Sequence, residues 1–429
     1  MFGFANFLLL ALFAAAVFDL IFALARGDGL RGALHGLWNT PHLLFGQQLA
    51  EWRLQLGRIL FAAGLAAYEI SVVFCNSMAR QNWAWVQGVM SPVLEWLAFL
   101  CFGAKILFGT RYTWRELLAG GALYFIARWV YFNSQNIWWI GIVVAVLAAK
   151  DVPLRRPLQV YFASGCAAMA VVLALHFAGI VAPDLTSERM GALRGTYGYG
   201  HPNTFGGLVF GLVLAYALLR AQKVRWVDCL LVFAVGVFLL VGPASRSAAL
   251  CTLALAVGLV FCRLRAGHSV PRWWPGTCAG MVGLTAAVSY LLPLLVIKVG
   301  PWNNDIGPAW LAKLDSLLTC RISLTWMAYR LLDVKIAGQV FNWPTVDNSF
   351  AFALFQFGPV VAALLGILFA AALLGHAKQG RRVEVCCLFA MLAYAYMEVQ
   401  PFHLTTNPTA LLLCGAVFAQ TSARWQKIE

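Results

Sequence analysis

Charged residues are scarce in this sequence, and acidic residues are the scarcest of them. Only 11% of the 429 residues are charged, and Asp and Glu together number 17, whereas 62% are hydrophobic and the mean hydropathy is +0.77. A soluble globular chain normally carries about 25% charged and about 45–50% apolar residues. The composition therefore excludes an ordinary soluble enzyme, a disordered protein and a fibrous protein, and it favours an integral membrane protein.

The sequence also lacks the residue patterns of metal and disulfide sites. Its eleven cysteines are scattered, nearly all within hydrophobic runs, and none belongs to a Cys-x-x-Cys pair or a Cys/His set with metal spacing. We expect them to be small buried hydrophobic residues and not a disulfide framework. No carboxylate cluster has metal spacing either, so we expect a reaction that needs no metal ion and no other cofactor.

Long hydrophobic runs are what the sequence has in abundance. A helix needs about 20 apolar residues to cross the roughly 30 Å hydrocarbon core, and continuous runs are typical of helices. We expect an all-α polytopic membrane protein of about thirteen (12–14) transmembrane helices, forming a single domain over residues 1–429. The first run starts at residue 2 without a preceding cation or a following cleavage site, which predicts a retained helix. The expected spans are 4–25, 58–76, 91–108, 115–133, 135–150, 157–180, 202–220, 226–242, 247–262, 275–299, 358–376, 384–400 and 404–421.

The net charge of +14 has an explanation within this topology. With the N-terminus outside, the inner loops hold 21 of the 31 Lys and Arg residues, the outer loops hold nine, and Arg128 lies inside a span. This bias satisfies the positive-inside rule. Because the cations are spread evenly over the inner loops and not gathered on one face, we expect no nucleic-acid partner.

Three connections depart from the pattern of short loops. Residues 38–57, on the inner side, contain apolar residues at helical spacing and predict an interfacial amphipathic helix. Residues 181–201 and 300–357 are long and lie on the outer side. The second of these is the expected large extracytoplasmic loop, and its stretch 309–336 also has helical apolar periodicity.

Three arginines on the expected outer side depart from the charge rule. Arg246 lies in a turn between two fifteen-residue apolar runs. Each run spans only about 22 Å, so we expect the turn to carry this cation into the membrane edge, where snorkelling to the headgroups is the alternative to a function. Arg321 interrupts the apolar face of 309–336, and a structural ion pair with Asp315 or Glu398 is the alternative there.

The third arginine, Arg194, opens a turn with three glycines within six residues, Arg194-Gly-Thr-Tyr-Gly-Tyr-Gly-His201-Pro-Asn203. Glycines allow the backbone to approach a ligand closely, and Pro202 is suited to the first turn of a helix. A helix N-terminus offers free N–H groups to a phosphate. For His201 a helix cap is the alternative to a functional role.

Two acidic residues complete the candidate set. Asp347 lies at the end of the long loop, where it is a candidate general base, cation partner or helix cap. Glu398 lies near the end of an expected span, where it is either functional or balances an arginine. Several cations at one outer site would suit a polyanion, and a pyrophosphate with a lipid tail fits a site at the membrane edge.

The order and spacing of these sequence motifs resemble those of the O-antigen polymerase/ligase superfamily of lipid-linked glycosyltransferases. The resemblance covers residues 190–410, about half of the chain, and is nearest to the capsular and exopolysaccharide repeat-unit polymerases. The matching pieces are the Arg194…Asn203 turn, Ser245-Arg246, Arg321-Ile-Ser-Leu324, Gly338-Gln339, Val346-Asp-Asn-Ser-Phe350 with Gly358, and Glu398…Asn407.

The resemblance implies a helical bundle with one large outer loop over the active site, in the bacterial cytoplasmic (inner) membrane. It implies that a glycan on undecaprenyl pyrophosphate is the donor and that the reaction inverts the anomeric carbon at the extracytoplasmic face. A polymerase transfers the glycan onto another lipid-linked repeat unit, and a ligase transfers it onto lipid A-core. A flippase and a chain-length regulator are the candidate protein partners.

Ligases of this superfamily carry a histidine where this sequence has Asp347, which favours a polymerase and leaves the base open between Asp347 and His201. A ligase remains the first alternative. A transporter of lipid-linked sugars or anions is the second, although we find no internal repeat of the kind that transporters often show. The expected catalytic residues are Asp347, His201 and Arg246, and the expected substrate-binding residues are Arg194, Arg321, Asn203, Asn348, Glu398, Tyr199 and Arg128.

Overall fold

Helices make up nearly all the regular structure in the computed structural model, which describes residues 2–26, 29–46, 49–181, 187–189, 192–297 and 307–418. Among these residues, eight helices are long and apolar enough to cross a membrane. By helix length and hydropathy the protein is therefore an all-α, multi-pass membrane protein, as expected. The eight contain α1 (Phe2–Ala25), α3 (Ala50–Cys75), α5 (Ser91–Phe108), α8 (Arg155–Phe177), α9 (Pro202–Leu219), α11 (Arg246–Leu264), α12 (Trp274–Leu291) and α16 (Pro359–Lys378).

Four further helices match expected spans but are shorter or less apolar. They are α6 (Trp114–Ser134), α7 (Ile137–Ala148), α10 (Trp226–Val241) and α17 (Arg382–Met397). The start of α6 is fixed by a capping box, in which the Thr113 side chain accepts from the Glu116 backbone N–H and the Glu116 carboxylate accepts from the Thr113 N–H. The smaller helical elements before residue 100 are α2 (Gly29–Asn39), α4 (Ala79–Asn82) and a π-helical turn at Val86–Met90 that leads into α5.

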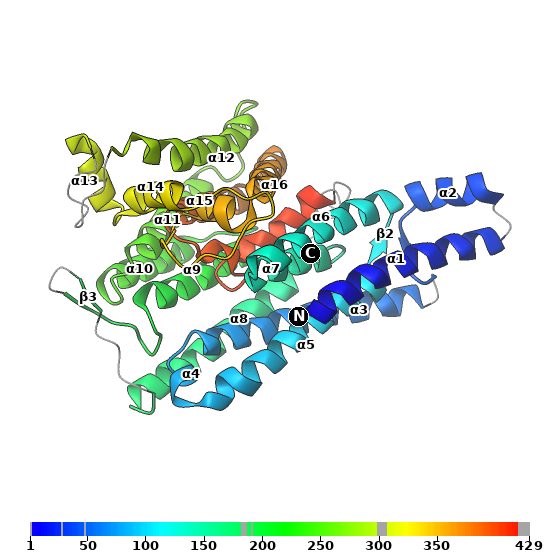
Figure 1. Cartoon of the computed structure of the whole chain (residues 1–429), viewed down its shortest axis with the longest axis horizontal. Helices are drawn as coiled ribbons and strands as arrows, with labels where there is room; N and C mark the ends of the chain where they lie inside the picture. Colours follow the sequence, from blue (N-terminus) through cyan, green and yellow to red (C-terminus); the bar gives the residue numbers. More distant parts are fainter. Residues whose placement is uncertain are drawn as a thin grey trace.

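The helices pack in two groups that α9 connects (Figure 1). In the N-terminal group, α3 packs against α5 and α8. In the C-terminal group, α11 packs against α10 and α17, and α12 packs against α16. Helix α9 contacts α8 on one side and α11 and α17 on the other, and one continuous hydrophobic cluster extends through both groups. The arrangement places the first residues of α9 and α11 at the same end of the bundle.

The expected interfacial helix over 38–57 differs from the structure. Helix α2 ends at Asn39, and residues 50–57 are the first turns of the long helix α3. Between them, β1 (His42–Leu43) pairs antiparallel with β2 (Arg111–Tyr112). The Arg53 guanidinium donates to the carbonyl oxygens of Leu44, Gly46 and Phe108. These tertiary bonds hold residues 42–46 in a non-helical connection, which the apolar periodicity alone does not reveal.

The last expected span, 404–421, also differs over its described part. Residues 408–417 form a 3-10 helix, Pro408–Leu413, followed by the single turn α18 (Cys414–Val417), and residues 419–421 lie outside the described part of the chain. The Asn407 side chain accepts from the Ala410 N–H, and Thr406 Oγ donates to the carbonyl oxygens of Gln400 and His403. Side-chain bonds to nearby backbone and a proline compete with a regular helix, so the chain folds back here as a short buried segment.

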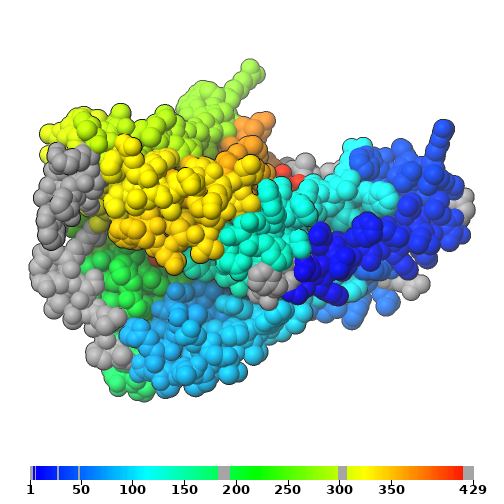
Figure 2. All heavy atoms as spheres, viewed as in Figure 1, coloured from blue at the N-terminus to red at the C-terminus, as the bar shows by residue number. Residues whose placement is uncertain are grey.

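The expected large loop 300–357 is described from residue 307 onward. It forms α13 (Ala309–Leu317), α14 (Arg321–Leu331) and α15 (Ser349–Phe352), with a π-helical turn at Ala353–Phe357. The single amphipathic stretch expected over 309–336 is divided into two helices, because Thr319 and Cys320 have positive φ angles of 60° and 63°. Figure 2 shows the yellow residues of this segment as a continuous layer on one face of the molecule. Two short strands, β3 (Ser187–Arg189) and β4 (Ala192–Arg194), pair antiparallel before α9.

Candidate functional site

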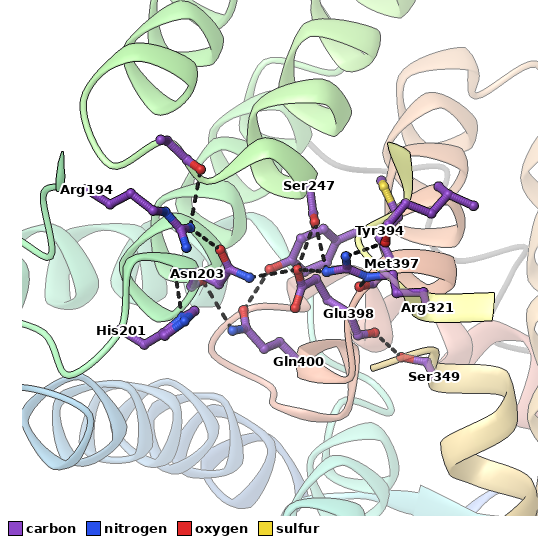
Figure 3. Close-up of polar contacts among 12 residues, drawn as sticks. Arg194, His201, Asn203, Ser247, Arg321, Ser349, Tyr394, Met397, Glu398 and Gln400 are labelled. Atoms are coloured by element: carbon purple, nitrogen blue, oxygen red, sulfur yellow. Dashed lines mark hydrogen bonds and ion pairs between the residues drawn. The ribbon is translucent and has the colours of Figure 1, made fainter. Parts of the chain in front are cut away.

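A buried carboxylate brings three distant segments together at one end of the bundle. Glu398, which follows the last residue of α17, accepts hydrogen bonds at Oε1 from Arg321 Nη2 at 2.6 Å, Ser247 Oγ at 2.8 Å and Asn203 Nδ2 at 3.1 Å. Figure 3 shows this convergence. The donors belong to the first turns of α14, α11 and α9. Three helix N-termini therefore surround one acidic group, an arrangement that favours negative charge.

Arg321 is the cation of this cluster and is itself nearly inaccessible. The residue is 7% exposed and Glu398 is 4% exposed. The Arg321 guanidinium also donates through Nε to the Met397 carbonyl oxygen and through Nη1 to the Leu318 carbonyl oxygen at 2.8 Å. Most of its N–H groups are thus used inside the protein. Arg321 is consequently suited to positioning Glu398 and the loop helix α14, and less suited to gripping a ligand directly.

The position of Arg321 is set locally by Asp315. Its Oδ1 atom accepts from the backbone N–H groups of Ile322 at 2.8 Å and Ser323 at 3.2 Å. Asp315 therefore caps the first turn of α14 from the preceding helix. Of the two ion-pair partners considered for Arg321, the structure selects Glu398, while Asp315 binds the backbone.

Asn203 extends the network to Arg194. Its Oδ1 atom accepts from Arg194 Nη2 at 2.9 Å, while its Nδ2 atom donates to Glu398. Arg194 Nη2 also donates to the Ala244 carbonyl oxygen at 3.2 Å, in the turn before α11. One amide side chain thus connects an arginine on one side with the Glu398–Arg321 ion pair on the other (Figure 3).

Gln400 holds the start of α9 against the segment that follows α17. Its Nε2 atom donates to the Asn203 carbonyl oxygen at 3.2 Å, and its Oε1 atom accepts from the Tyr394 hydroxyl at 2.7 Å. A Cβ atom at Gly207 would lie 1.8 Å from Gln400 Oε1, so glycine is required for this close approach. Sequence reasoning did not single out Gln400 or Ser247 as site residues, because their roles depend on partners more than 150 residues away.

Arg246 is the exposed arginine beside this buried network. It is the first residue of α11 and directly precedes Ser247, which donates to Glu398. The Ala244 carbonyl oxygen two residues earlier accepts from Arg194. The structure therefore places all three singled-out arginines at one end of the bundle. Two of them are buried in the network, and the third lies at the surface next to it.

His201 and Asn348 both act as helix caps in this region. The His201 Nδ1 atom accepts from the Asn203 N–H at 3.1 Å, which makes His201 the cap of α9. The Asn348 Oδ1 atom accepts from the N–H groups of Phe350 and Ala351 and caps α15, while its Nδ2 atom donates to Ser289 Oγ. An imidazole that accepts at Nδ1 carries its proton at Nε2, so in this tautomer neither ring nitrogen of His201 is available to act as a base.

Asp347 is the half-buried acid of the site. It lies two residues before Ser349, whose Oγ donates to the Glu398 carbonyl oxygen at 2.5 Å. Within the described part of the chain, Asp347 makes no hydrogen bond or ion pair. Its carboxylate is thus available to accept a proton from a bound molecule.

Two expected site residues lie elsewhere. Arg128, on α6, donates to the Asn6 side chain of α1 and lies over the Phe132 ring. Tyr199 is fully buried, packs against Phe205, and has no hydrogen-bond partner for its hydroxyl in the described structure. Neither residue belongs to the Glu398 network.

Replacing Tyr199 by phenylalanine is expected to leave the protein equally stable or to stabilise it. A buried hydroxyl without a partner costs about 1–3 kcal/mol, and Tyr199→Phe removes that hydroxyl. The matched control is Tyr161→Phe, because the equally buried Tyr161 hydroxyl donates to the Thr405 carbonyl oxygen. Thermal unfolding in detergent should show a lower midpoint for Tyr161→Phe only. A lower midpoint for Tyr199→Phe as well would mean that its hydroxyl has a partner.

Among the buried acids that the sequence analysis did not single out, Glu69 is the least exposed. Glu69 lies within α3, is 2% exposed, and its Oε2 atom has no hydrogen-bond partner in the described structure. A Cβ atom at Gly165 would lie 2.8 Å from Glu69 Oε1, which places this carboxyl against α8. The only signal in the sequence is an acidic residue inside an apolar run, a feature typical of groups that face a bundle interior.

The cluster combines features that suit an anion: an exposed arginine, Arg246, at the N-terminus of α11, two further arginines held in the network behind it, and a half-buried acid that could accept a proton. Among the described residues, no group of three or more His, Cys, Asp or Glu side chains could hold a metal ion. All eleven cysteines are free thiols. The chain matches no protein-family model, no curated protein and no solved structure.

Proposed function

We propose that the protein is a polysaccharide polymerase, a glycosyltransferase that moves a glycan from undecaprenyl pyrophosphate onto a lipid-linked repeat unit. One observation carries the proposal. The residues of the ordered motifs, 194–203, 246–247, 321, 347–349 and 398, are far apart in the sequence yet lie at one end of the bundle around the Arg321–Glu398 ion pair. A resemblance made of short motifs gains weight when those motifs meet in space.

In this proposal the exposed Arg246 makes the first contact with the pyrophosphate. Its guanidinium can bind two phosphate oxygens at once, and it opens α11, whose N-terminus adds partial positive charge. Arg194 and Asn203 lie behind it, and Arg321 holds Glu398 in place. Arg246 and the N-terminus of α11 stabilise the charge that builds up on the departing pyrophosphate, and the buried network holds them in place. A metal ion has this role in many other transferases, so the reaction is proposed to be metal-independent.

Asp347 is the proposed general base. It removes the proton from the acceptor hydroxyl as that oxygen attacks the anomeric carbon of the donor. The bond between the anomeric carbon and the pyrophosphate oxygen breaks, its electron pair leaves with undecaprenyl pyrophosphate, and the configuration is inverted. His201 is the less suitable base, because its Nδ1 atom already accepts from the Asn203 N–H.

The topology of the proposal follows the charge distribution. The site faces the extracytoplasmic side of the bacterial cytoplasmic membrane, the segment 307–357 covers it there, and the cation-rich loops face the cytoplasm. The partners are the lipid-linked donor and acceptor, the bilayer, a flippase that delivers the repeat units and a chain-length regulator.

The test is elongation by purified protein given a defined lipid-linked oligosaccharide in the presence of EDTA, with product size measured by mass spectrometry. Wild-type protein is expected to build longer chains. Arg246→Ala removes a charge-assisted contact worth about 1.5–3 kcal/mol and should slow elongation about tenfold to a hundredfold. Arg330→Ala, an exposed cation of α14 over Trp326, is the matched control and should elongate normally.

Two results would overturn the proposal. Normal elongation by Arg246→Ala would show that the proposed contact between Arg246 and the pyrophosphate is not needed for the reaction. A product that forms only when lipid A-core is added, with glycan joined to it, would identify the ligase alternative.

A further inference from the structure

A basic cavity lies at the opposite end of the helices that build the candidate site. It has a volume of about 540 Å³ and is lined by residues 221–224, 262–263, 266–267 and 379–384. The first segment follows α9, the second and third lie at and just beyond the end of α11, and the last leads into the first turn of α17. Because α9 and α11 begin in the candidate site and α9 is 18 residues long, about 27 Å of helix separates the two places. The cavity is therefore a separate feature of the fold.

The lining carries four cations, Lys223, Arg263, Arg381 and Arg382, against one acid, Glu384. Arg382 is used structurally, since its guanidinium donates to the carbonyl oxygens of Arg265, His268 and Ser269 and so fixes the connection between α11 and α12. Among the described residues, Lys223, Arg263 and Arg381 make hydrogen bonds only through their backbone atoms, and their side chains form no ion pair within 4 Å. Four cations against a single acid thus leave the cavity with an excess of positive charge, which attracts an anion.

Aromatic and apolar residues beside the cavity place it at the level of lipid headgroups. Trp226, the first residue of α10, is 53% exposed, and the next residue, Val227, is 71% exposed. Exposed tryptophans at helix ends are typical of the membrane–water interface, and exposed apolar residues along a spanning helix face the acyl chains. Lys223 precedes Trp226 by three residues. The acyl chains of a lipid whose phosphate lies in the cavity could therefore extend along α10.

We propose that this cavity binds the phosphate headgroup of an anionic phospholipid on the cytoplasmic side of the membrane. Lys223, Arg263 and Arg381 supply the charge, and Arg382 shapes the wall. Basic pockets between helix ends on this side of a membrane are suited to such headgroups, with about 1 kcal/mol from each cation. The proposal does not depend on the reaction at the Glu398 site.

The test compares lipid binding by two triple variants with equal loss of charge. Lys223→Gln, Arg263→Gln and Arg381→Gln together remove the cations of the cavity. Arg31→Gln, Arg155→Gln and Arg156→Gln together remove three exposed cations of the same expected face, outside the cavity. Detergent-solubilised full-length protein is titrated with phosphatidylglycerol and with phosphatidylcholine, and bound lipid is counted by native mass spectrometry.

Wild-type protein and the control variant should bind phosphatidylglycerol about a hundredfold more tightly than the cavity variant, and phosphatidylcholine should bind weakly to all three. Equal binding of both lipids by the wild-type protein, or equal losses in both triple variants, would overturn the proposal. Saturation by inorganic phosphate without any preference for the lipid would mean a free-anion site and would also overturn it. If the cavity variant is poorly folded, Arg263→Gln alone should still weaken lipid binding about fivefold.

Discussion

The Arg321→Ala variant is expected to unfold at a markedly lower temperature than the wild-type protein. Arg321 Nη2 lies 2.6 Å from Glu398 Oε1, and the side chains are only 7% and 6% exposed. Removing one partner of a buried ion pair leaves an uncompensated charge, which typically costs about 3–5 kcal/mol. Two carbonyl oxygens, those of Met397 and Leu318, lose their donor as well. The loss should be visible as a lower thermal midpoint in detergent before any activity is measured.

A double variant separates stability from function. Replacing both charges, with Arg321→Met and Glu398→Leu, removes the unpaired charge and should restore much of the thermal stability, because an apolar pair often substitutes well for a buried ion pair. The double variant should nevertheless remain inactive, since Asn203 and Ser247 lose the carboxylate that positions them. Glu51→Ala is the control, because it breaks an exposed pair with Arg111 at 3.5 Å and should change stability very little. An unchanged midpoint for Arg321→Ala would show that the ion pair does not contribute to the fold.

Local signals in the sequence were sufficient to predict where several helices begin. The proline after His201 indicated the start of α9, and the apolar periodicity around Arg321 indicated a helix in the loop. Long apolar runs likewise predicted the long membrane helices. Each of these features depends on residues within a few positions of one another, which is the range over which helix propensity and capping act.

Features that depend on distant partners could not be predicted in the same way. From the sequence, Asp315 and Glu398 were both candidate ion-pair partners of Arg321, and only the folded chain distinguishes them. The segment 42–46 carries helical periodicity but is held in a connection by Arg53 and by pairing with residues 111–112. Tertiary hydrogen bonds outweigh local preference in both cases, since each buried polar group must find a partner.

In the candidate site, too, local features could be predicted from the sequence and tertiary contacts could not. The sequence identified the three arginines as unusual because each breaks the charge rule by itself. It could not show that Arg321 and Arg194 are buried while Arg246 is exposed, because burial follows from how α9, α11 and α14 meet. The structure thereby distinguishes residues that looked equivalent: Arg194 and Arg321 are held inside the network, and Arg246 lies at the surface.

The Asp347→Asn variant should elongate chains about 10²–10⁴-fold more slowly than the wild-type protein, the loss typical of removing a general base. Its fold should be unaffected, because Asp347 is half-buried and makes no hydrogen bond or ion pair with any described residue. His201→Gln provides the comparison. It removes the cap of α9 and should lower stability by about 1 kcal/mol with a much smaller effect on rate. Initial rates and thermal midpoints of both variants decide the assignment, and a large rate loss in His201→Gln alone would move the base to His201.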